Sequence, residues 1–416
     1  MNHKKDVLII GGGVVGICSA YYLARQGRQV TVIEAGDICS GASYGNAGLL
    51  LLSHIVPLAA PGVLGQGLKW LLNPESPFYI KPRVSLELAS WLWRFRAACS
   101  RTRALNAMPL LQELVVRSMA LYQEMASTEK FEFGFETKGQ LKLFNTHRGF
   151  QSAQAEVGHL ARFGIESEAL LPDEIRRLEP SIRRNVVGGI LVPKDAHLNP
   201  SEFVVQLAKL VKASGVDIRT STEALGFRAD GSKVMAVETT RGDFYPEQIV
   251  LAGGAWSPRL TASLGLRLPI QAAKGYSVTL KRGPDSPVRP LMLGEAKVAV
   301  TPYRDTIRFG GTLELCGLDP TVTRRRQRAI MQSTREYISG TEDLEVIEIW
   351  RGFRPCLPDG LPVIGYTARY KNLIIAAGHG MIGMAHGPVT GKLVADLACH
   401  HKTEFNIDPL RLERFC

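Results

Sequence analysis

The fold is decided by residues 6–34, which read DVLIIGGGVVGICSAYYLARQGRQVTVIE. Residues 6–10 are a short apolar run that predicts a buried strand, and residues 14–26 have the apolar spacing of a helix. Residues 29–34 predict a second strand that ends in an acid. The order strand, glycine turn, helix, strand and acid predicts a site for an adenine dinucleotide.

Each glycine of the turn has a separate task in such a unit. Gly11 makes the tight turn, Gly13 lets a pyrophosphate approach the backbone, and Gly16 lets the helix lie close to the sheet. The helix N-terminus offers free N–H groups and the positive end of its dipole to the phosphates. Glu34 can accept a hydrogen bond from a ribose hydroxyl, and an acid there favours FAD or NAD over NADP. The predicted contacts of this unit are Gly11, Gly13, Val14, Val15, Gly16, Glu34 and Ala35.

The composition is that of a globular chain of 416 residues, 45% hydrophobic and 21% charged, which is long enough for two domains. The seven cysteines are scattered, and no two have metal-ligand or redox spacing. We therefore expect a reducing compartment and no metal site. No secretory leader precedes the first strand, which predicts a cytoplasmic protein. The net charge of +11 is compatible with nucleic acid or anionic lipid, but zinc-finger and RNA-binding motifs are missing, so nucleic acid is not expected.

A stretch without charged residues, from Ile38 to Leu68, is the only candidate for a membrane span in the sequence. Its prolines and glycines argue against a helix, and we expect a buried loop that covers a cofactor. Residues 68–72 and 91–96 mix aromatic rings with cations, which suits peripheral contact with the cytoplasmic face of a membrane. The alternative, a helix packed on its own domain, stays open. The residues of this candidate surface are Lys69, Trp70, Trp91, Trp93, Arg94, Arg96, Arg101 and Arg103.

Later segments continue the dinucleotide-binding pattern. Helices are predicted at 201–214 and 387–400, and strands at 216–220, 248–252 and 372–377. The last two strands end in small residues, as the first strand of the chain does. Such strand ends can present their backbone to one ligand at the carboxyl edge of a sheet.

Alternating patterns and turns at 130–145 and 270–312 indicate an antiparallel sheet outside this unit. The sequence therefore predicts an α/β protein with two discontinuous domains. A cofactor domain would comprise residues 1–50, 150–262 and 350–416, and a substrate domain residues 51–149 and 263–349.

Short motifs occur in a fixed order along nearly the whole chain. They are the glycine turn with Glu34, SYGNAG at 43–48, AAPG at 59–62, LKW at 68–70, GQLKLF at 139–144, KGYS at 274–277, GFRP at 352–355, PDG at 358–360 and GHG at 378–380. Together they resemble the D-amino-acid dehydrogenases within the D-amino-acid oxidase and glycine oxidase superfamily. The resemblance implies FAD, a glutathione-reductase-like Rossmann domain, and a substrate domain built on a mixed or antiparallel sheet. It also implies oxidation of an amino acid at Cα to an imino acid.

The resemblance also implies roles for individual residues. Arg354 would grip the substrate carboxylate, which suits its planar fork of donors. Tyr276 and Tyr303 would bind the carboxylate or line the pocket, and His379 and His54 would make polar contacts near the flavin. Further cofactor contacts would be Ser43, Asn46, Ala47, Gly48, Ala224, Ala252, Gly253, Gly378, Gly380, Met381, Ile382, Gly383 and Met384.

The predicted reaction is FAD-dependent oxidative deamination of a neutral, apolar or aromatic D-amino acid. A hydride would pass from Cα to flavin N5, and the electrons would go on to a quinone or another acceptor that is not oxygen. Cys356 lies near Arg354, but the residues around it do not match those of relatives that attach flavin covalently, so noncovalent FAD is expected. The alternatives are a D-proline or D-hydroxyproline dehydrogenase, a glycine- or sarcosine-type oxidase, and a non-catalytic FAD-binding subunit of a complex. Residues 49–52, four leucines, are more apolar than expected of the family and leave the substrate range open.

Overall fold

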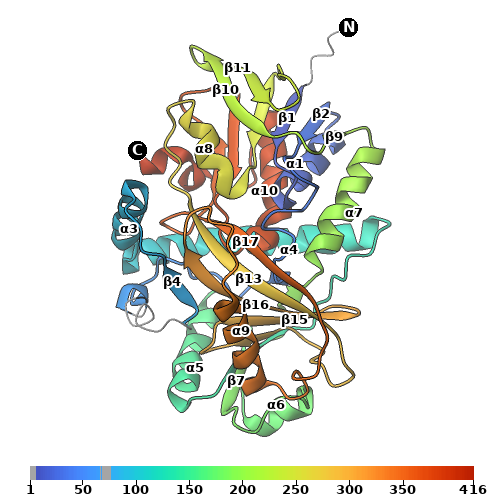
Figure 1. Ribbon diagram of the computed structural model, residues 1–416, viewed down its shortest axis with the longest axis vertical. Coiled ribbons are helices and arrows are strands. Elements are labelled where there is room, and N and C mark those ends of the chain that lie inside the picture. Colours follow the sequence, from blue (N-terminus) through green and yellow to red (C-terminus); the bar gives the residue numbers. More distant parts are fainter. Residues whose placement is uncertain (1–5, 66, 68–75) are drawn as a thin grey trace.

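Two large sheets make up the molecule, and they lie towards opposite ends of its long axis (Figure 1). The structure, a computed structural model, describes residues 6–65, 67 and 76–416. Within these residues one sheet has six strands and the other has nine, and two small sheets have two strands each. This arrangement agrees with a Rossmann-type cofactor unit and a second sheet unit.

The six-stranded sheet has the strand order β18-β19-β12-β1-β2-β9. Its strands are parallel except for β18, which runs antiparallel to β19. All five strands predicted for the dinucleotide unit belong to this sheet, so that prediction is confirmed. The strands are β1 Val7–Ile10, β2 Val30–Ile33, β9 Asp217–Arg219, β12 Gln248–Leu251, β18 Val363–Tyr366 and β19 Leu373–Ala377.

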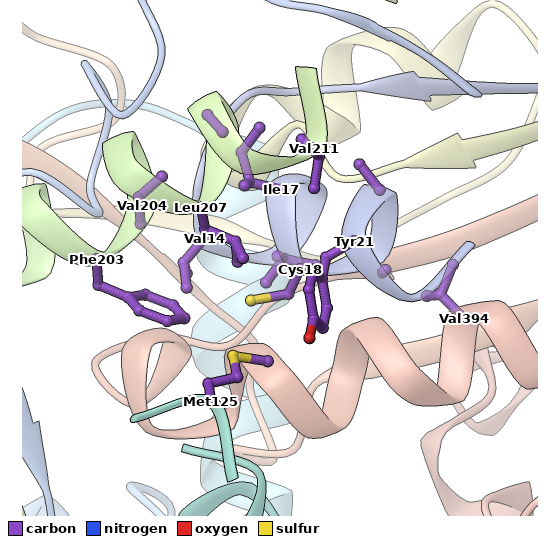
Figure 2. Packing of buried hydrophobic residues seen from close by; sticks show 14 of the residues in the cluster. Val14, Ile17, Cys18, Tyr21, Met125, Phe203, Val204, Leu207, Val211 and Val394 are labelled. Atoms are coloured by element: carbon purple, nitrogen blue, oxygen red, sulfur yellow. The ribbon is translucent and has the colours of Figure 1, made fainter. Parts of the chain in front are cut away.

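Helices α1 (Val14–Arg25), α7 (Pro200–Ala213) and α10 (Gly383–Ala398) share one large hydrophobic core with this sheet. Figure 2 shows α1 between the other two, with its apolar side chains directed at both. The other face of the sheet is covered by the hairpin β10 (Ala224–Asp230) and β11 (Lys233–Thr239) and by α8 (Ser257–Ala262). The glycine turn before α1 is therefore held at a fixed place on the edge of a buried sheet.

The last long helix differs from its prediction at 387–400. It begins earlier, at Gly383, and ends at Ala398, and short 3₁₀ turns at Asp408–Leu410 and Leu412–Phe415 follow it. Pro388 inside the helix cannot donate to the carbonyl of Met384, four residues before it. The hydroxyl of Tyr122 donates to that carbonyl instead, at 2.6 Å. A side chain from another helix thus allows α10 to start before the proline, which the local sequence could not show.

The nine-stranded sheet is mixed, in agreement with the prediction. Its order is β17-β13-β16-β15-β14-β5-β7-β6, and β4 pairs with β16. Most pairs are antiparallel, while β14 with β5 and β16 with β4 are parallel. The strands are β4 Phe78–Ile80, β5 Gln140–Phe144, β6 Glu168–Leu170, β7 Gly188–Val192, β13 Gln271–Lys281, β14 Leu291–Leu293, β15 Val298–Pro302, β16 Thr306–Leu315 and β17 Val346–Cys356.

The remaining described elements cover the sheets or connect them. They are α3 Leu86–Ala98, α4 Arg101–Thr128, α5 His147–Arg162, α6 Pro172–Leu178, the 3₁₀ turn Gly254–Trp256, α9 Arg324–Tyr337, and the two-stranded pair β3 Leu49–Leu50 with β8 Ala196–His197. Helix α9 packs on one face of the nine-stranded sheet, which leaves the opposite face for the site described below.

Sheet membership differs from the predicted domain limits in two places. Strands β6 and β7 lie in the segment 150–262 assigned to the cofactor domain, but they pair within the nine-stranded sheet, and β17 crosses the limit at 350. Helix α4, assigned to the substrate domain, packs its residues Val115, Met119 and Met125 into the core around α1 and α10. Periodicity identifies a strand or a helix but not the partner against which it packs, so these segments were misplaced.

Candidate active site

A large cavity of about 1860 Å³ lies between the two sheets. One side of it is formed by the carboxyl ends of β1, β12 and β19, and the other by the face of the nine-stranded sheet. In open α/β sheets ligands bind outside the carboxyl ends of the strands, so the cavity is where a dinucleotide would lie.

The glycine turn fits a pyrophosphate in geometry as well as in sequence. Gly11 has a φ of +116°, and a Cβ atom on it would lie 2.5 Å from the carbonyl oxygen of Ala252. A Cβ on Gly16 would lie 1.9 Å from the carbonyl oxygen of Gly11. The backbone N–H of Val14, at the start of α1, donates to Ser43 Oγ at 3.0 Å. Only glycines leave this much room, and what they expose to the cavity is the donor-rich N-terminus of α1.

Glu34 lies in the cavity wall beyond this turn. Its two oxygens accept hydrogen bonds from the backbone N–H of Gly12, at 2.7 Å, and of Gly36, at 2.9 Å. The carboxylate is thereby fixed, and each oxygen keeps a lone pair for a ribose hydroxyl. Ala35 and Ala224 line the same end of the cavity.

The segment 43–48 borders the cavity with Ser43, Gly45, Asn46 and Ala47. Asn46 connects two parts of the wall, because its Nδ2 donates to the carbonyl of Met381 at 3.4 Å and its Oδ1 accepts from Gly48 N at 2.8 Å. Of the twenty predicted cofactor contacts, the structure places all in the wall except Gly16 and Gly48, which pack behind it. Their contacts with a bound cofactor stay predictions.

Tyr303 does not line the cavity, contrary to the prediction. It is buried behind the segment 43–48, and its hydroxyl donates to the carbonyl of Ala47 at 3.1 Å. Arg308 supports the same segment, because its Nη1 donates to the carbonyls of Tyr44 and Asn46 at 2.7 and 3.0 Å. Both side chains therefore hold the cofactor segment from the nine-stranded sheet.

Arg354 faces the cavity from β17, as predicted. Its Nη1 donates to the carbonyl of Thr312 at 2.8 Å, and Thr312 has a strained backbone with a φ of +66°. The guanidinium lies directly over Gly275, where a Cβ would meet Nη1 at 1.6 Å. Burial lowers the pKa of Arg354, and no carboxylate of the described residues pairs with it. A half-buried guanidinium at a cavity wall, with no acid beside it, favours an anionic ligand.

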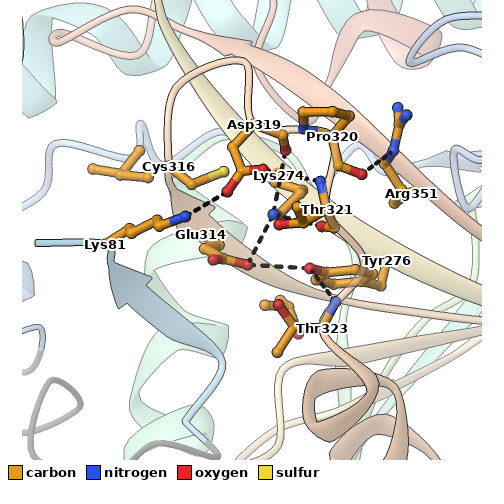
Figure 3. A network of polar contacts seen from close by, with 12 residues as sticks. Lys81, Lys274, Tyr276, Glu314, Cys316, Asp319, Pro320, Thr321, Thr323 and Arg351 are labelled. Carbon is orange, nitrogen blue, oxygen red and sulfur yellow. Dashed lines mark hydrogen bonds and ion pairs between the residues drawn. The ribbon is translucent and has the colours of Figure 1, made fainter. Parts of the chain in front are cut away.

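Tyr276, by contrast, is on the wrong face of β13 to bind substrate. Its hydroxyl donates to Glu314 Oε2 at 3.2 Å and accepts from the N–H of Thr323, also at 3.2 Å. Figure 3 shows it within a buried polar network that includes Lys274, whose Nζ donates to the carbonyl of Thr321 at 2.9 Å. This network joins the outer face of the sheet to the loop before α9, and the prediction for Tyr276 is corrected accordingly.

The two predicted histidines both border the cavity. His379 is buried, its Nε2 lies 3.0 Å from Thr390 Oγ1, and burial lowers its pKa to about 4. The pKa of His54 is lowered by burial and by the charges of Lys142 and Lys297. Both rings are therefore neutral near pH 7, which suits hydrogen bonding rather than charge pairing. Their contacts with flavin stay predictions.

The structure of helix α3 shows that the prediction of a membrane-facing surface was wrong for Trp91. Trp91 is buried, stacks on Phe95 with ring centroids 5.0 Å apart, and donates from Nε1 to the carbonyl of Cys356 at 3.1 Å. Trp93 points outwards and is 69% exposed. Lys69 and Trp70 lie outside the described residues. Within the part of the chain that is described, no helix has the length and apolar character needed to cross a bilayer.

Among the wall residues that sequence reasoning missed are Thr312, Trp350, Lys142 and Lys297. Thr312 acts through a backbone carbonyl, which leaves no signal in a side-chain pattern. Trp350 packs against Gly45 and Gly352, at positions where a Cβ would lie 1.9 Å from its ring. Lys142 stood inside the motif GQLKLF, and its alternation with leucines could have marked it as facing away from the core.

Similarity to known proteins shows the family to which the chain belongs. A family profile described as FAD dependent oxidoreductase matches residues 6–397. A protein of Neisseria meningitidis named D-amino acid dehydrogenase is 32% identical over 98% of this chain and 99% of its own length. One of the same name from Allorhizobium ampelinum is 34% identical over 98% of each.

Solved structures show the same architecture. Glycine oxidase from Geobacillus kaustophilus has a TM-score of 0.79 at 25% identity and covers 98% of both chains. L-proline dehydrogenase from P. horikoshii has the same TM-score at 21% identity, which shows the fold alone.

The chain belongs to the family of FAD-dependent oxidoreductases, and the glycine cradle and Glu34 have the geometry to hold the ADP half of FAD. Within that family it is an enzyme of the D-amino acid dehydrogenase type, since relatives of that name match it from end to end.

Proposed function

We propose that this enzyme oxidises a D-amino acid with a neutral, apolar or aromatic side chain to the corresponding imino acid, which water converts to the 2-oxo acid. The observation that carries the proposal is Arg354, a half-buried guanidinium at the cavity wall that has no acid partner among the described residues. The names of the relatives that match the whole chain support the same substrate class.

Arg354 would hold the substrate carboxylate through two parallel hydrogen bonds and so orient Cα–H. The carbonyl of Thr312 fixes one arm of the guanidinium before substrate arrives, so less ordering remains to be done on binding. FAD, when bound, supplies the acceptor for the hydride and the electrons. Leu49, Leu51 and Ile382 contribute apolar wall, which excludes water and suits an apolar side chain.

We propose that FAD is held without a covalent bond. Cys356 borders the cavity, but burial raises the pKa of its thiol to about 12. At neutral pH it is a protonated thiol and a poor nucleophile. The cradle around Gly11 and Glu34 supplies the noncovalent contacts instead.

The test is anaerobic bleaching of the yellow protein by a panel of D- and L-amino acids, followed by addition of oxygen or a soluble quinone. Bleaching by apolar D-amino acids with reoxidation by quinone is the expected result. Preference for D-proline or D-hydroxyproline, or fast reoxidation by oxygen with glycine or sarcosine as substrate, would replace the proposal with one of those activities. If no amino acid bleaches the flavin, FAD is structural and the proposal fails.

We propose in addition that electrons leave at a membrane, which the enzyme touches through the outer face of α3. Leu86 is 88% and Trp93 69% exposed there, and Arg96 lies 5.8 Å from the ring of Trp93. Each cation near an anionic surface contributes about 1 kcal/mol, which salt screens. Cosedimentation with anionic liposomes should therefore be weak and lost at high salt. Equal sedimentation with neutral liposomes, or none at low salt, excludes this surface.

A further inference from the structure

A buried carboxylate that the chemistry described above does not use belongs to Asp195, between β7 and β8. Its side chain is 0% exposed, and no cation of the described residues forms an ion pair with it. An ionised group that is buried without a counter-ion costs folding free energy unless hydrogen-bond donors surround it. The donors to this carboxylate therefore show what it holds.

The donors to Asp195 come from a turn of the chain at residues 51–54. Oδ1 accepts from the backbone N–H of Leu52 at 2.7 Å and from that of Ser53 at 3.4 Å. Oδ2 accepts from Ser53 Oγ at 2.9 Å. Three hydrogen bonds thus tie one carboxylate to two successive residues of the turn.

The turn 51–54 has little other backbone support. It follows β3, which pairs with β8 directly after Asp195. Within the described residues, the turn itself closes with one backbone hydrogen bond, from His54 N to the carbonyl of Leu51 at 3.2 Å. The carboxylate therefore supplies more hydrogen bonds to the turn than the turn's own backbone does.

The same turn forms part of the wall of the active-site cavity, and three of its four residues border that cavity. A second, smaller cavity of about 40 Å³ is lined by His54 together with Cys356 and His379. Cys356 is the last residue of β17, two residues after Arg354. The turn therefore lies beside the end of the strand that carries the proposed carboxylate-binding residue.

The charged groups near Asp195 are paired with other residues or neutral. The titratable residues on the neighbouring segments are His54, Glu136, Lys138, Lys194 and His197. Lys138 pairs with Glu136 at 2.7 Å, and Lys194 pairs with Glu166 at 3.2 Å. The pKa values of both histidines are lowered, chiefly by burial, so their rings are neutral near pH 7. Burial raises the pKa of Asp195 to about 7 against the effect of its hydrogen bonds, so this carboxyl group titrates near neutral pH.

Protonation weakens the hold of Asp195 on the turn. Hydrogen bonds to a carboxylate are about twice as strong as those to a neutral acceptor. A protonated carboxyl group also turns one oxygen into a donor, and a protonated Oδ2 and the hydroxyl of Ser53 cannot both donate along the same contact. The turn is therefore held more firmly by the ionised group than by the neutral one.

We propose that Asp195 is a positioning residue of the active site. Its ionised carboxylate holds the turn 51–54 beside the end of β17 and so keeps the cavity wall in the shape that binds an apolar substrate. This inference rests on the proposed function and extends it to a residue that acts through its neighbours, since Asp195 itself does not border the cavity.

The first test needs no turnover. Hydrogen exchange of the peptide that spans residues 49–56 is measured on the oxidised holoenzyme from about pH 6 to about pH 8, with rates corrected for the intrinsic effect of pH. At the upper pH, protection of this peptide should be about tenfold lower in Asp195→Asn than in the parent, because a neutral acceptor replaces a charged one. Asp230→Asn, which changes an exposed carboxylate on β10 outside the cavity, is the control and should match the parent. Equal protection in Asp195→Asn and the parent overturns the proposal.

The second test asks whether the held turn matters for a ligand. The oxidised holoenzyme is titrated with 4-methyl-2-oxopentanoate, the product expected from D-leucine, which has no group that titrates near neutral pH, while the flavin absorbance is followed. The dissociation constant of the parent should rise by up to about tenfold as the pH falls through the pKa of Asp195, whereas Asp195→Asn should bind weakly at every pH. Ser53→Ala keeps the carboxylate and loses only the contact with Oδ2, so it should bind with intermediate affinity and keep the pH dependence.

A role in the fold alone would lower stability without moving this pH profile. A parent dissociation constant that does not vary with pH, or the same pH dependence in Asp195→Asn, therefore overturns the positioning role. If no amino acid bleaches the flavin, the proposed function fails, while the exchange measurement still decides whether Asp195 holds the turn.

Discussion

Replacing Arg354 separates a ligand-binding role from a structural one, because the two roles predict opposite effects on stability. The guanidinium is half-buried, donates to the carbonyl of Thr312 and has no acid partner among the described residues. A partly desolvated cation without an acid partner costs folding free energy, so Arg354→Met should unfold at the same temperature as the parent or at a higher one. An arginine that served the fold through an ion pair would instead lower the midpoint.

The kinetic effect follows from the lost hydrogen bonds. A hydrogen bond to a charged group contributes about 1.5–3 kcal/mol, and 1.4 kcal/mol corresponds to a factor of ten. Loss of a bidentate contact should therefore lower kcat/KM by roughly 10²-fold or more in Arg354→Met. Arg354→Lys should rescue little of this, because an ammonium cannot replace the fork.

The assay for Arg354 is anaerobic flavin reduction over a range of D-leucine concentrations, beside thermal unfolding of the holoenzyme and measurement of its FAD content. FAD content should not change, since the cradle around Gly11 and Glu34 is formed by other residues. Near-normal kinetics in Arg354→Met with FAD bound would refute the assignment. A large fall in the unfolding midpoint would refute the claim that the charge is unpaired.

Three further outcomes are expected. Tyr303→Phe removes one hydrogen bond, to the carbonyl of Ala47, so the free energy of unfolding should fall by about 1 kcal/mol. The value of kcat/KM should change less than about threefold. A large loss of kcat would show that Tyr303 acts at the reacting centre after all. Acid precipitation should release the yellow colour into the supernatant, and colour retained in the pellet of the parent but not of Cys356→Ala would show a covalent link. The pKa of His379 is depressed to about 4, so the neutral ring stabilises the fold above its ordinary pKa of 6.5 and that stability is lost as the pH falls towards 4. His379→Gln should lose less stability between pH 6.5 and 4 than the parent does. If the unfolding temperatures of the two proteins fall in parallel over this pH range, the lowered pKa of His379 is contradicted.

Local patterns predicted the dinucleotide unit because all its signals lie within residues 6–34. The strand, the glycines and Glu34 stand in the order that the geometry requires, so the unit could be predicted without knowing that β1 pairs with β12. The predictions at 276 and 303 depended on which face of a strand borders the cavity. Alternation divides a strand into two faces but does not say which face borders the cavity, and a shift of one residue exchanges them. Tyr276 thus lies with Glu314 on the outer face, while Gly275 beside it lies under Arg354.

The cavity wall at Lys142 and Lys297 could not be predicted from the sequence for a different reason. Lys142 and Lys297 are brought together by the parallel pairing of β5 with β14, two strands far apart in the chain. No local pattern encodes such a pairing, although each strand alone was predictable as a strand.

One face of the nine-stranded sheet positions both the segment 43–48 and the residue proposed to bind the substrate carboxylate. Arg354 on β17 donates to the carbonyl of Thr312 on β16, two strands away. Arg308, also on β16, donates to two carbonyls of the segment 43–48. Because β13 pairs with both β16 and β17 over most of its length, the separation between the Arg354 guanidinium and this segment is set by strand pairing rather than by a loop. A preformed separation can orient a substrate only if the residues that support it do not move. We therefore expect the orientation of the substrate to depend on the paired strands of this sheet.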